Sequence, residues 1–324
     1  MEIILITGGA GYIGSHIALE LLKSKFNVFV IDNLSNSSTN SLNAVEKLTG
    51  KKISFEEGDI RNQDFLDQFF KIHSIDCVIH CAGLKAVAES IQKPYEYYEN
   101  NIIGSLNLIK AMKNYSVKKL IFSSSATVYD ENEKMPLFET SAIGQGQNPY
   151  ARTKIMIDKI LQDEVMSSSN WSIIVLRYFN PVGNDPSCLL GEDPKGIPNN
   201  LMPLINQAAF NTRKLTVFGA DYDTPDGSAI RDYFHVSDLA IGHVNSVQKI
   251  LQDKNDLKIF NLGLGQGISV LQLINIYQDI NDIKFDYSIG DRRLGDLPIC
   301  YAENKLAKQE LGWQPIFTHH DMCK

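Results

Sequence analysis

Short apolar runs alternate with amphipathic helical patterns through the first 177 residues of the chain. The runs that predict strands are Ile3–Thr7, Phe26–Ile31, Ile53–Glu57, Cys77–His80, Leu120–Ser123 and Ile173–Arg177. The patterns that predict helices are Ile13–Leu22, Asp64–Phe70, Ala86–Ser90, Tyr95–Met112 and Tyr150–Met166. This alternation is typical of a parallel sheet, and the near-continuous apolar strands indicate that both of its faces are covered. We therefore predict an α/β fold with a doubly wound parallel sheet.

The character of the sequence changes near Tyr178. Gly, Pro, Asn and Asp crowd the segment NPVGNDPSCLLGEDPKGIPNN, which predicts loops, and a long loop-rich stretch in a compact protein usually serves function. We predict a first domain over residues 1–177 and a smaller, partly interleaved C-terminal substrate domain over residues 178–324. The segments RDYFHVSDLA and IFNLG, near residues 231–268, are expected to return to the main sheet.

The charge and the apolar runs exclude two classes of partner. Lys and Arg number 31 against 38 Asp and Glu, which gives a net charge of −7, so we predict no nucleic-acid partner. The longest apolar runs have the length of strands, so we predict no membrane partner. Met1 leads almost directly into the apolar run Ile3–Ile6, and no secretory signal peptide is expected.

Cysteine and histidine usage indicates the compartment and the absence of a metal. The five cysteines are odd in number and scattered, which favours a reducing compartment and a cytoplasmic location. The seven histidines form no HExxH or Cys/His zinc spacing, so we predict no metal site.

A glycine-rich turn, TGGAGYIGSH, joins the first predicted strand to the first predicted helix. Gly9, Gly11 and Gly14 match the pattern G-x-G-x-x-G, and Gly8, Gly11 and Gly14 give the related spacing G-x-x-G-x-x-G. Glycines at such a turn let backbone N–H groups approach a pyrophosphate, which the positive N-terminus of the helix then stabilises. The turn therefore predicts a dinucleotide site.

Acidic residues end the second and third predicted strands. Asp32 lies 24 residues after Gly8, where a carboxylate accepts hydrogen bonds from both ribose hydroxyls and repels a 2′-phosphate, so NAD is favoured over NADP. The alternative is a solvated aspartate in a turn. Asp59 is expected beside the adenine ring.

The turn after the fourth predicted strand also faces this dinucleotide site. Its residues Ala82, Gly83 and Lys85 are expected to contact the cofactor. Lys85 is equally well interpreted as an ordinary surface lysine.

Three Tyr-x-x-x-Lys pairs occur in the chain. They are Tyr115 with Lys119, Tyr150 with Lys154, and Tyr301 with Lys305. Only the second pair opens a predicted helix just after a strand, and that strand ends in the hydroxyl-rich SSSATVY at the edge where α/β sheets bind ligands.

On a helix, residues four apart share a face, and a neighbouring cation lowers a tyrosine pKa by roughly 1–3 units. We therefore expect Lys154, helped by a nicotinamide ring, to lower the pKa of Tyr150 so that it serves as a general base. Ser125 is expected to hydrogen-bond the same substrate oxygen. The alternative interpretation is a surface tyrosine with a solvated lysine.

Ten segments now combine into a recognisable order: TGGAGYIGSH, DNLSNSS, EGDIRN, HCAGLKAV, SSSATVY, PYxxxK, RYFNPVG, GIPNNLMP, RDYFHVSDLA and RRxGDLP. Together they closely resemble the bacterial UDP-glucose 4-epimerases of the extended short-chain dehydrogenase/reductase superfamily. The resemblance covers nearly the whole chain and implies a Rossmann domain with tightly held NAD. It also implies that Tyr150 removes the proton of the sugar 4-hydroxyl while hydride leaves C4. The ketone then turns and regains the hydride on its other face, with Ser125 and Lys154 as the other catalytic residues.

The resemblance also implies the binding residues. For the cofactor they are Gly8, Gly11, Tyr12, Ile13, Gly14, Asp32, Asn33, Asp59, Ile60, Cys81, Ala82, Gly83, Lys85, Asn100, Ser125, Tyr150, Lys154 and Tyr178. For the UDP-sugar substrate they are Ser125, Tyr150, Asn180, Asn200, Leu201, Val217, Phe218, Arg231, Arg293, Asp296 and Cys300. Arg231 and Arg293 supply the cationic forks that a diphosphate requires, and Phe218 offers a face for uracil.

Two further expectations follow from the resemblance. Many bacterial members carry a bulky tyrosine where this chain has Cys300, and a small residue accompanies members that accept N-acetylated sugars, so turnover of UDP-GlcNAc and UDP-GalNAc is expected as well. Relatives are typically homodimers joined by a four-helix bundle, for which Tyr95–Met112 and Tyr150–Met166 are the candidate helices.

Two rival functions share the expected fold. A sugar-nucleotide dehydratase needs an Asp–Glu pair just after the hydroxyls of the fifth strand, where this chain has Ala126 and Thr127. A non-catalytic nucleotide-sensing protein commonly loses the Tyr or the Lys of the pair, and both are present here.

Overall fold

A parallel sheet forms the centre of the molecule. The computed structural model describes residues 2–167, 170–195, 198, 200–252, 256–293 and 295–324. Within these residues the sheet has seven strands, all parallel. Their order across the sheet is β11 (Leu257–Leu262), β6 (Ser172–Tyr178), β5 (Lys119–Ser125), β4 (Cys77–His80), β1 (Ile3–Thr7), β2 (Asn27–Asp32) and β3 (Ser54–Glu57). The predicted α/β fold is confirmed.

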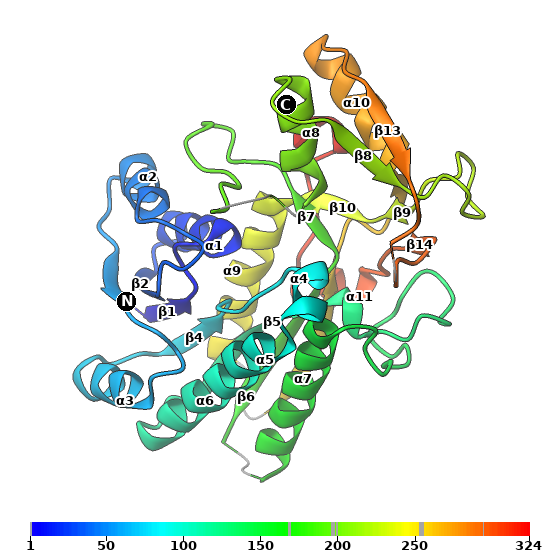
Figure 1. Ribbon diagram of the computed structural model, residues 1–324. Coiled ribbons are helices and arrows are strands. Elements are labelled where there is room, and N and C mark those ends of the chain that lie inside the picture. Colours follow the sequence, from blue (N-terminus) through cyan, green and yellow to red (C-terminus); the bar gives the residue numbers. More distant parts are fainter. Residues whose placement is uncertain (1, 168–169, 196–197, 199, 253–255, 294) are drawn as a thin grey trace.

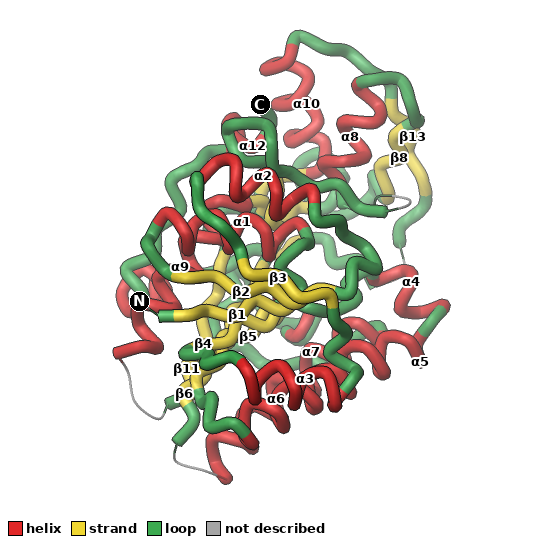
Figure 2. Tube along the Cα trace, turned by 90° about the vertical axis from the view of Figure 1, so that its left-hand side faces the viewer, coloured by secondary structure: helices red, strands yellow, loops and turns green. Residues whose placement is uncertain are grey.

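Helices cover both faces of this sheet (Figure 2). One face carries α1 (Tyr12–Lys23), α2 (Asn40–Thr49) and α9 (Val236–Gln252), and the other carries α3 (Gln63–Ile72), α6 (Gly104–Asn114) and α7 (Pro149–Ser167). Side chains alternate along each strand, so Ile4 and Ile6 enter the core beneath α1 whereas Leu5 enters the core beneath α3. Both faces of β1 are therefore apolar, as its sequence indicated.

The segment between β4 and β5 differs from the prediction. The structure divides the predicted helix Tyr95–Met112 into α5 (Pro94–Tyr97), the π-helix η1 (Tyr98–Ile103) and α6, after a short α4 (Val87–Gln92). A π-helix inside a helical stretch frequently marks a functional site, because it re-aims side chains. We did not predict α2, of which only Leu42 and Val45 are buried.

The C-terminal part of the chain forms small sheets above the carboxyl edge of the main sheet (Figure 1). They pair β7 (Asn180–Val182) with β10 (Tyr233–His235), β8 (Leu215–Phe218) with β13 (Tyr287–Gly290), and β9 (Ile230–Arg231) with β12 (Ile268–Ser269) and β14 (Ile299–Cys300). The remaining elements are the 3-10 turn η2 (Ala126–Val128), α8 (Leu201–Ala209), α10 (Val270–Asn281), α11 (Lys305–Glu310) and α12 (His319–Met322).

The C-terminal part also returns to the main sheet, because β11 pairs with β6 and α9 packs beside α1. The division of the chain into domains at residue 177 stays our proposal. Among the described residues, no helix is both long enough and apolar enough to span a membrane.

The chain leaves β1 toward one edge of the sheet and leaves β4 toward the other. Such a reversal opens a crevice at the carboxyl ends of the two strands, where doubly wound proteins bind ligands. The candidate site lies there.

Candidate functional site

The turns that follow β1 and β4 touch each other at the floor of the crevice. A Cβ atom added to Gly8, whose φ is +74°, would lie 2.7 Å from the backbone nitrogen of Ala82. A Cβ on Gly14 would lie 2.3 Å from the carbonyl oxygen of Gly8. Side chains at these two positions would therefore fill the turn. Tyr12 and Ile13 open α1, whose N-terminus has no side-chain cap. A turn of this shape, at an uncapped helix N-terminus, fits a pyrophosphate.

Asp32 is buried at the end of β2 and is not a solvated turn residue. One carboxylate oxygen accepts the N–H of Ala10 at 3.0 Å, and the other accepts the N–H of Leu34 and the hydroxyl of Ser37, each at 2.9 Å. A carboxylate offers about four acceptor positions, so one further hydroxyl can still be accepted. This environment fits a ribose contact.

Asn33 and Asp59, both predicted to bind the cofactor, contact each other. The Asn33 amide donates to Asp59 at 2.9 Å, and Arg61 donates to the same carboxylate from Nε and from a terminal nitrogen at 3.0 and 2.7 Å. Chiefly because of Arg61, the pKa of Asp59 falls to about 2. The neighbouring Ile60 is buried against Gly104 at the start of α6.

A buried asparagine that the sequence did not single out holds the turn after β4. Asn101, in the π-helix, accepts the N–H of Leu84 at 2.8 Å and donates to the carbonyl of Leu84 and to the hydroxyl of Thr153 on α7, both at 3.0 Å. It also accepts from the predicted cofactor residue Asn100 at 3.0 Å. Asn101 thus fixes the β4 turn to α7, and its position in an amphipathic helical pattern gave no signal of this.

Ser125, Tyr150 and Lys154 come together beside this turn. Ser125 ends β5, and Tyr150 stands in the first turn of α7, where burial raises the pKa of the phenol and the nearby Ser125 hydroxyl lowers it. The Lys154 ammonium donates to the carbonyl of Ser123 at 2.7 Å and lies 6.0 Å from the centroid of the Tyr150 ring. A Cβ added to Gly83 would lie 4.0 Å from the same nitrogen.

The other two Tyr-x-x-x-Lys pairs do not share a helix face. Tyr115 follows the last residue of α6, and Lys119 begins β5. Tyr301 follows β14, and Lys305 begins α11.

The expected lowering of the Tyr150 pKa is not found in the chain itself. Burial raises the pKa of Tyr150 above its usual value, and the neighbouring Ser125 hydroxyl opposes this only in part. Burial also lowers the pKa of Lys154 to about 8, although Cys81 and Asp158 oppose that shift. The expectation counted the neighbouring cation and a nicotinamide ring and left out desolvation, which penalises both charged forms.

A buried ion pair supports α7, the helix that carries Tyr150 and Lys154. Asp158, one turn after Lys154, lies 3.2 Å from Arg177 and accepts the hydroxyl of Ser124 at 2.9 Å. Arg177 is fully buried and also donates to the carbonyl of Glu139 at 3.3 Å. The pair joins α7 to β5 and β6 directly beneath Ser125. The only sequence signals were the i+4 spacing from Lys154 and an arginine at the end of an apolar strand.

Tyr178 and Cys81, predicted cofactor residues, belong to a second buried network. The hydroxyl of Ser123 donates to the Cys81 sulfur at 3.0 Å, and Tyr178 donates to that hydroxyl at 2.8 Å. Tyr178 is also hydrogen-bonded to His243 of α9. Burial raises the pKa of Cys81 to about 11 and lowers the pKa of His243 to about 4, so both side chains are neutral near pH 7. This network holds Ser123 in place, and the carbonyl of Ser123 accepts the hydrogen bond from Lys154.

Several predicted substrate residues also meet, above the carboxyl edge. The Arg293 guanidinium lies over the Phe218 ring at 4.2 Å, and Arg231 forms an ion pair with Asp296 at 3.2 Å. Cys300 pairs with Arg231 in the register of β14 against β9. An aromatic face, two arginines and an acceptor suit a nucleoside diphosphate.

The other predicted substrate residues differ in which of their atoms a ligand can reach. Asn180 begins β7, and Leu201 begins α8. The Val217 side chain is buried, so only its main chain is available to a ligand. Asn200 donates to Glu192 at 2.6 Å, and Glu192 also pairs with Lys85 at 3.1 Å. The sequence gave no signal for Glu192, which lies in the loop-rich segment.

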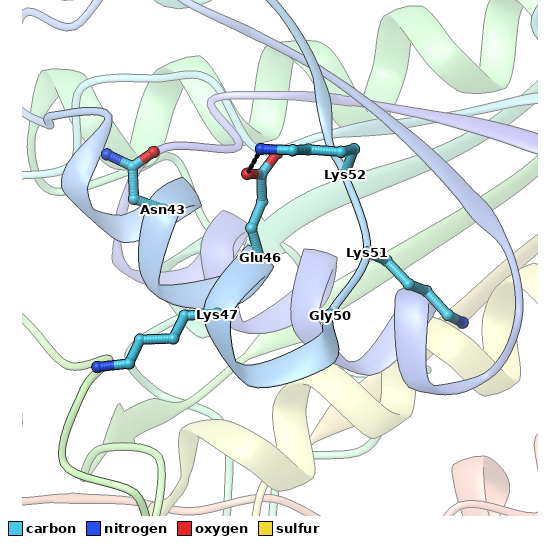
Figure 3. A pocket seen from close by; sticks show the side chains of 6 residues that line it. All are labelled: Asn43, Glu46, Lys47, Gly50, Lys51 and Lys52. Carbon is cyan, nitrogen blue, oxygen red and sulfur yellow. Dashed lines mark hydrogen bonds and ion pairs between the residues drawn. The ribbon is translucent and has the colours of Figure 1, made fainter.

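A surface hollow of about 340 Å³ lies elsewhere, where Gly50 ends α2 and the chain enters β3 (Figure 3). That position is at the amino edge of the sheet, away from Ser125, Tyr150 and Lys154. Lys52 is paired with Glu46, and Lys51 donates to the carbonyl of Leu22, so these cations already have partners. The residues that the structure describes contain no group of three or more His, Cys, Asp or Glu side chains placed to hold a metal ion.

Residues 4–263 match the model of the NAD dependent epimerase/dehydratase family. The chain belongs to this family. Within the family, the UDP-glucose 4-epimerase of Pasteurella multocida is 51% identical over 322 residues, which cover 99% of this chain and 95% of that protein.

Solved structures of other epimerases share the fold. UDP-glucose 4-epimerase from Bifidobacterium longum in complex with NAD+ and UDP superposes with a TM-score of 0.96 at 46% identity, covering 99% of this chain and 96% of that chain. The UDP-Glc/GlcNAc 4-epimerase from Campylobacter jejuni gives a TM-score of 0.86 at 32% identity, covering 100% of this chain and 97% of that chain.

Proposed function

We propose that this chain is a UDP-glucose 4-epimerase, which interconverts UDP-galactose and UDP-glucose and holds NAD as its cofactor. The observation that carries the proposal is the meeting of Ser125, Tyr150 and Lys154 at the crevice of a chain that aligns over 99% of its length with such an enzyme. A dehydratase would need an acid after β5. Ala126 offers none, and the Thr127 hydroxyl donates to Ser125 at 3.0 Å.

The residues present fit NAD. The turn that Gly8 and Gly14 keep open suits the pyrophosphate, and the buried Asp32 retains capacity to accept a ribose hydroxyl. Asn33, Gly83, Lys85 and the other cofactor residues named from the sequence are proposed to complete the site. NAD, when bound, supplies an acceptor for hydride and a positive charge on its oxidised ring.

The catalytic side chains then accept and return one proton. Tyr150 takes the proton of the sugar 4-hydroxyl and later returns it, while Ser125 hydrogen-bonds the same oxygen. Because burial favours the neutral phenol, this role requires positive charge at the site. Lys154 is the cation that the chain supplies, since its pKa of about 8 leaves it mostly charged at pH 7.

Replacement of Tyr150 by Phe tests the proposed function. We expect the turnover of UDP-galactose, followed by a coupled UDP-glucose dehydrogenase, to fall about 10²–10⁴-fold because the proton acceptor is lost. The NAD content of each preparation is measured so that rates are compared per NAD-loaded enzyme, and the thermal midpoint should stay unchanged. Tyr115→Phe, which removes the hydroxyl of an unrelated Tyr/Lys pair, is the matched control and should retain full activity. An active Tyr150→Phe variant contradicts the mechanism, and a wild-type chain that binds UDP without turnover indicates a sensor.

We further propose that the enzyme accepts UDP-GlcNAc and UDP-GalNAc. Support comes from Cys300, a small side chain beside Arg231, and from similarity to an epimerase of both UDP-Glc and UDP-GlcNAc.

We also propose a homodimer and a cytoplasmic location. The apolar side chains exposed on α4 to α7 support the dimer: Val87, Ile91, Tyr95, Ile103, Leu106 and Met156. Five unpaired cysteines support a reducing compartment.

A further inference from the structure

Glu192 bonds a residue of the proposed cofactor site and a residue of the proposed substrate site through one oxygen atom. Its Oε1 lies 3.1 Å from the Lys85 ammonium and accepts a hydrogen bond of 2.6 Å from the Asn200 amide. We propose that Glu192 is a positioning residue, which holds its own loop over the NAD site through Lys85 and orients Asn200 for the sugar nucleotide. This role rests on the proposed function, because that function assigns Lys85 and Asn200 to the two ligands.

The loop that carries Glu192, residues 183–195, is called the bridging loop. It is fastened to the cofactor side at both ends. The Tyr12 hydroxyl donates to the carbonyl of Gly183 at 2.6 Å, and the Lys195 ammonium donates to the carbonyl of Leu34 at 2.7 Å. The Lys195 N–H also donates to Asn36 at 3.0 Å. With the pair between Glu192 and Lys85, the loop reaches the segments that follow β1, β2 and β4, which are the three segments that carry most predicted NAD contacts.

The bridging loop is folded on itself, so Glu192 has a fixed place. The Asp185 N–H donates to the carbonyl of Leu190, and the Ser187 N–H donates to the Asp185 carboxylate, both at 2.9 Å. Leu190 is buried in the core that also holds α1. The Glu192 side chain is only 10% exposed, whereas that of Lys85 is 44% exposed. The carboxylate is therefore the more enclosed partner, and it restrains the more exposed lysine.

The two bonds of Glu192 depend on different properties of its side chain. The pair with Lys85 requires a negative charge, and its partial burial weakens screening by solvent and salt. The bond from Asn200 requires only an acceptor oxygen, although a charged acceptor strengthens it. The charge also reaches the cofactor turn, since burial raises the pKa of Tyr12 and the Glu192 charge adds to that rise. Glutamine in this place keeps an acceptor and removes the charge, so it separates the two roles.

The test compares Glu192→Gln and Glu192→Ala holoenzymes with the unaltered protein. NAD release is followed as the loss of protein-bound nucleotide with time after dilution, with charcoal removing the nucleotide that is set free, and KM and kcat are measured with UDP-galactose. We expect both variants to release NAD at least tenfold faster. KM should rise at least fivefold in Glu192→Ala and stay within twofold in Glu192→Gln, while kcat at saturating NAD stays within twofold in both.

Unchanged NAD release and unchanged KM in both variants would overturn the proposed role. If Glu192→Ala does not fold, the isosteric Glu192→Gln decides through its NAD release. Asp193→Ala, which removes the adjacent carboxylate of the same loop, is the matched control. Equal acceleration of NAD release in Asp193→Ala would indicate a general loosening of the loop and would also overturn the role. Turnover of UDP-galactose by the unaltered chain tests the proposed function separately, so the two failures are distinguishable.

Discussion

Tyr150 and Lys154 both lose water when the chain folds, and this loss shifts their pKa values in opposite directions. The phenol becomes less acidic, and the ammonium gives up its proton near pH 8 instead of near its usual value. Both shifts favour neutral groups in the folded chain alone. The spacing of the pair predicted that the two residues meet, but only the structure shows how strongly they are desolvated. The site is therefore poised for a ligand that brings positive charge.

At the same scale, Cys300 provides a prediction about substrate choice. We expect Cys300→Tyr to reduce turnover of UDP-GlcNAc at least tenfold, because a larger side chain beside Arg231 takes the room of the acetamido group. Turnover of UDP-galactose should stay within about threefold. Both rates are measured side by side on the same preparation. An unaltered chain without turnover of the acetylated pair, or a variant that keeps it, contradicts the assignment.

Among the elements, the first strand, turn and helix were the most predictable. The predicted Ile3–Thr7 coincides with β1, and the predicted helix Ile13–Leu22 lies within α1. The stretch from Tyr95 to Met112 was less predictable, because a π-helix interrupts it where Asn101 turns inward to bond Leu84 and Thr153. The apolar spacing is read over the whole helical stretch, so it does not reveal such a local change. The hydrogen bonds that Asn101 makes there join it to partners 17 and 52 residues away.

The turn before α1 provides a prediction at the scale of elements. In Gly14→Ala the new methyl group would meet the Gly8 carbonyl at 2.3 Å, so α1 must move away from the turn. We expect the NAD content of the purified protein, measured from its absorbance spectrum, to fall at least tenfold.

Gly50→Ala is the matched control for this prediction. Gly50 has a φ of +66° and no neighbour within 4 Å of an added Cβ, so the substitution costs roughly 1–2 kcal/mol of stability without obstructing the turn. NAD content should remain at the wild-type level. A Gly14→Ala protein that retains NAD shows that the close approach is not needed for binding.

Across the whole molecule, segments far apart in sequence build the site together. The sheet supplies the cofactor turns, the small C-terminal sheets supply the arginines, and the bridging loop joins the two through Glu192. Elsewhere on the molecule, helices α4 to α7 leave an apolar face exposed, although most apolar side chains of this chain are buried. Exposed apolar patches of this kind mark interaction surfaces.

The exposed face of α4 to α7 provides the prediction about assembly. Ile103 and Leu106 are 48% and 43% exposed, and we expect the double change Ile103→Glu and Leu106→Glu to convert a dimer into a monomer. Charges on this face cannot be buried against a second copy without a large desolvation cost. Light scattering after size-exclusion chromatography gives the mass. Ile72→Glu, at a 74% exposed residue on α3, is the control and should leave the mass unchanged. A monomeric wild-type protein contradicts the proposed dimer.

The sequence by itself determined the parallel sheet, the glycine turn, the acidic ends of β2 and β3 and the one Tyr-x-x-x-Lys pair, among the three, that shares a helix. These features depend on periodicity and on spacings within one strand, turn or helix, which the local chain dictates. Only the tertiary structure decided the pKa shifts of Tyr150 and Lys154, the ion pair of Asp158 with Arg177, and the bridge that Glu192 makes to Lys85 and Asn200. Burial and long-range pairing depend on which distant segments exclude water from a side chain, and no local pattern records that.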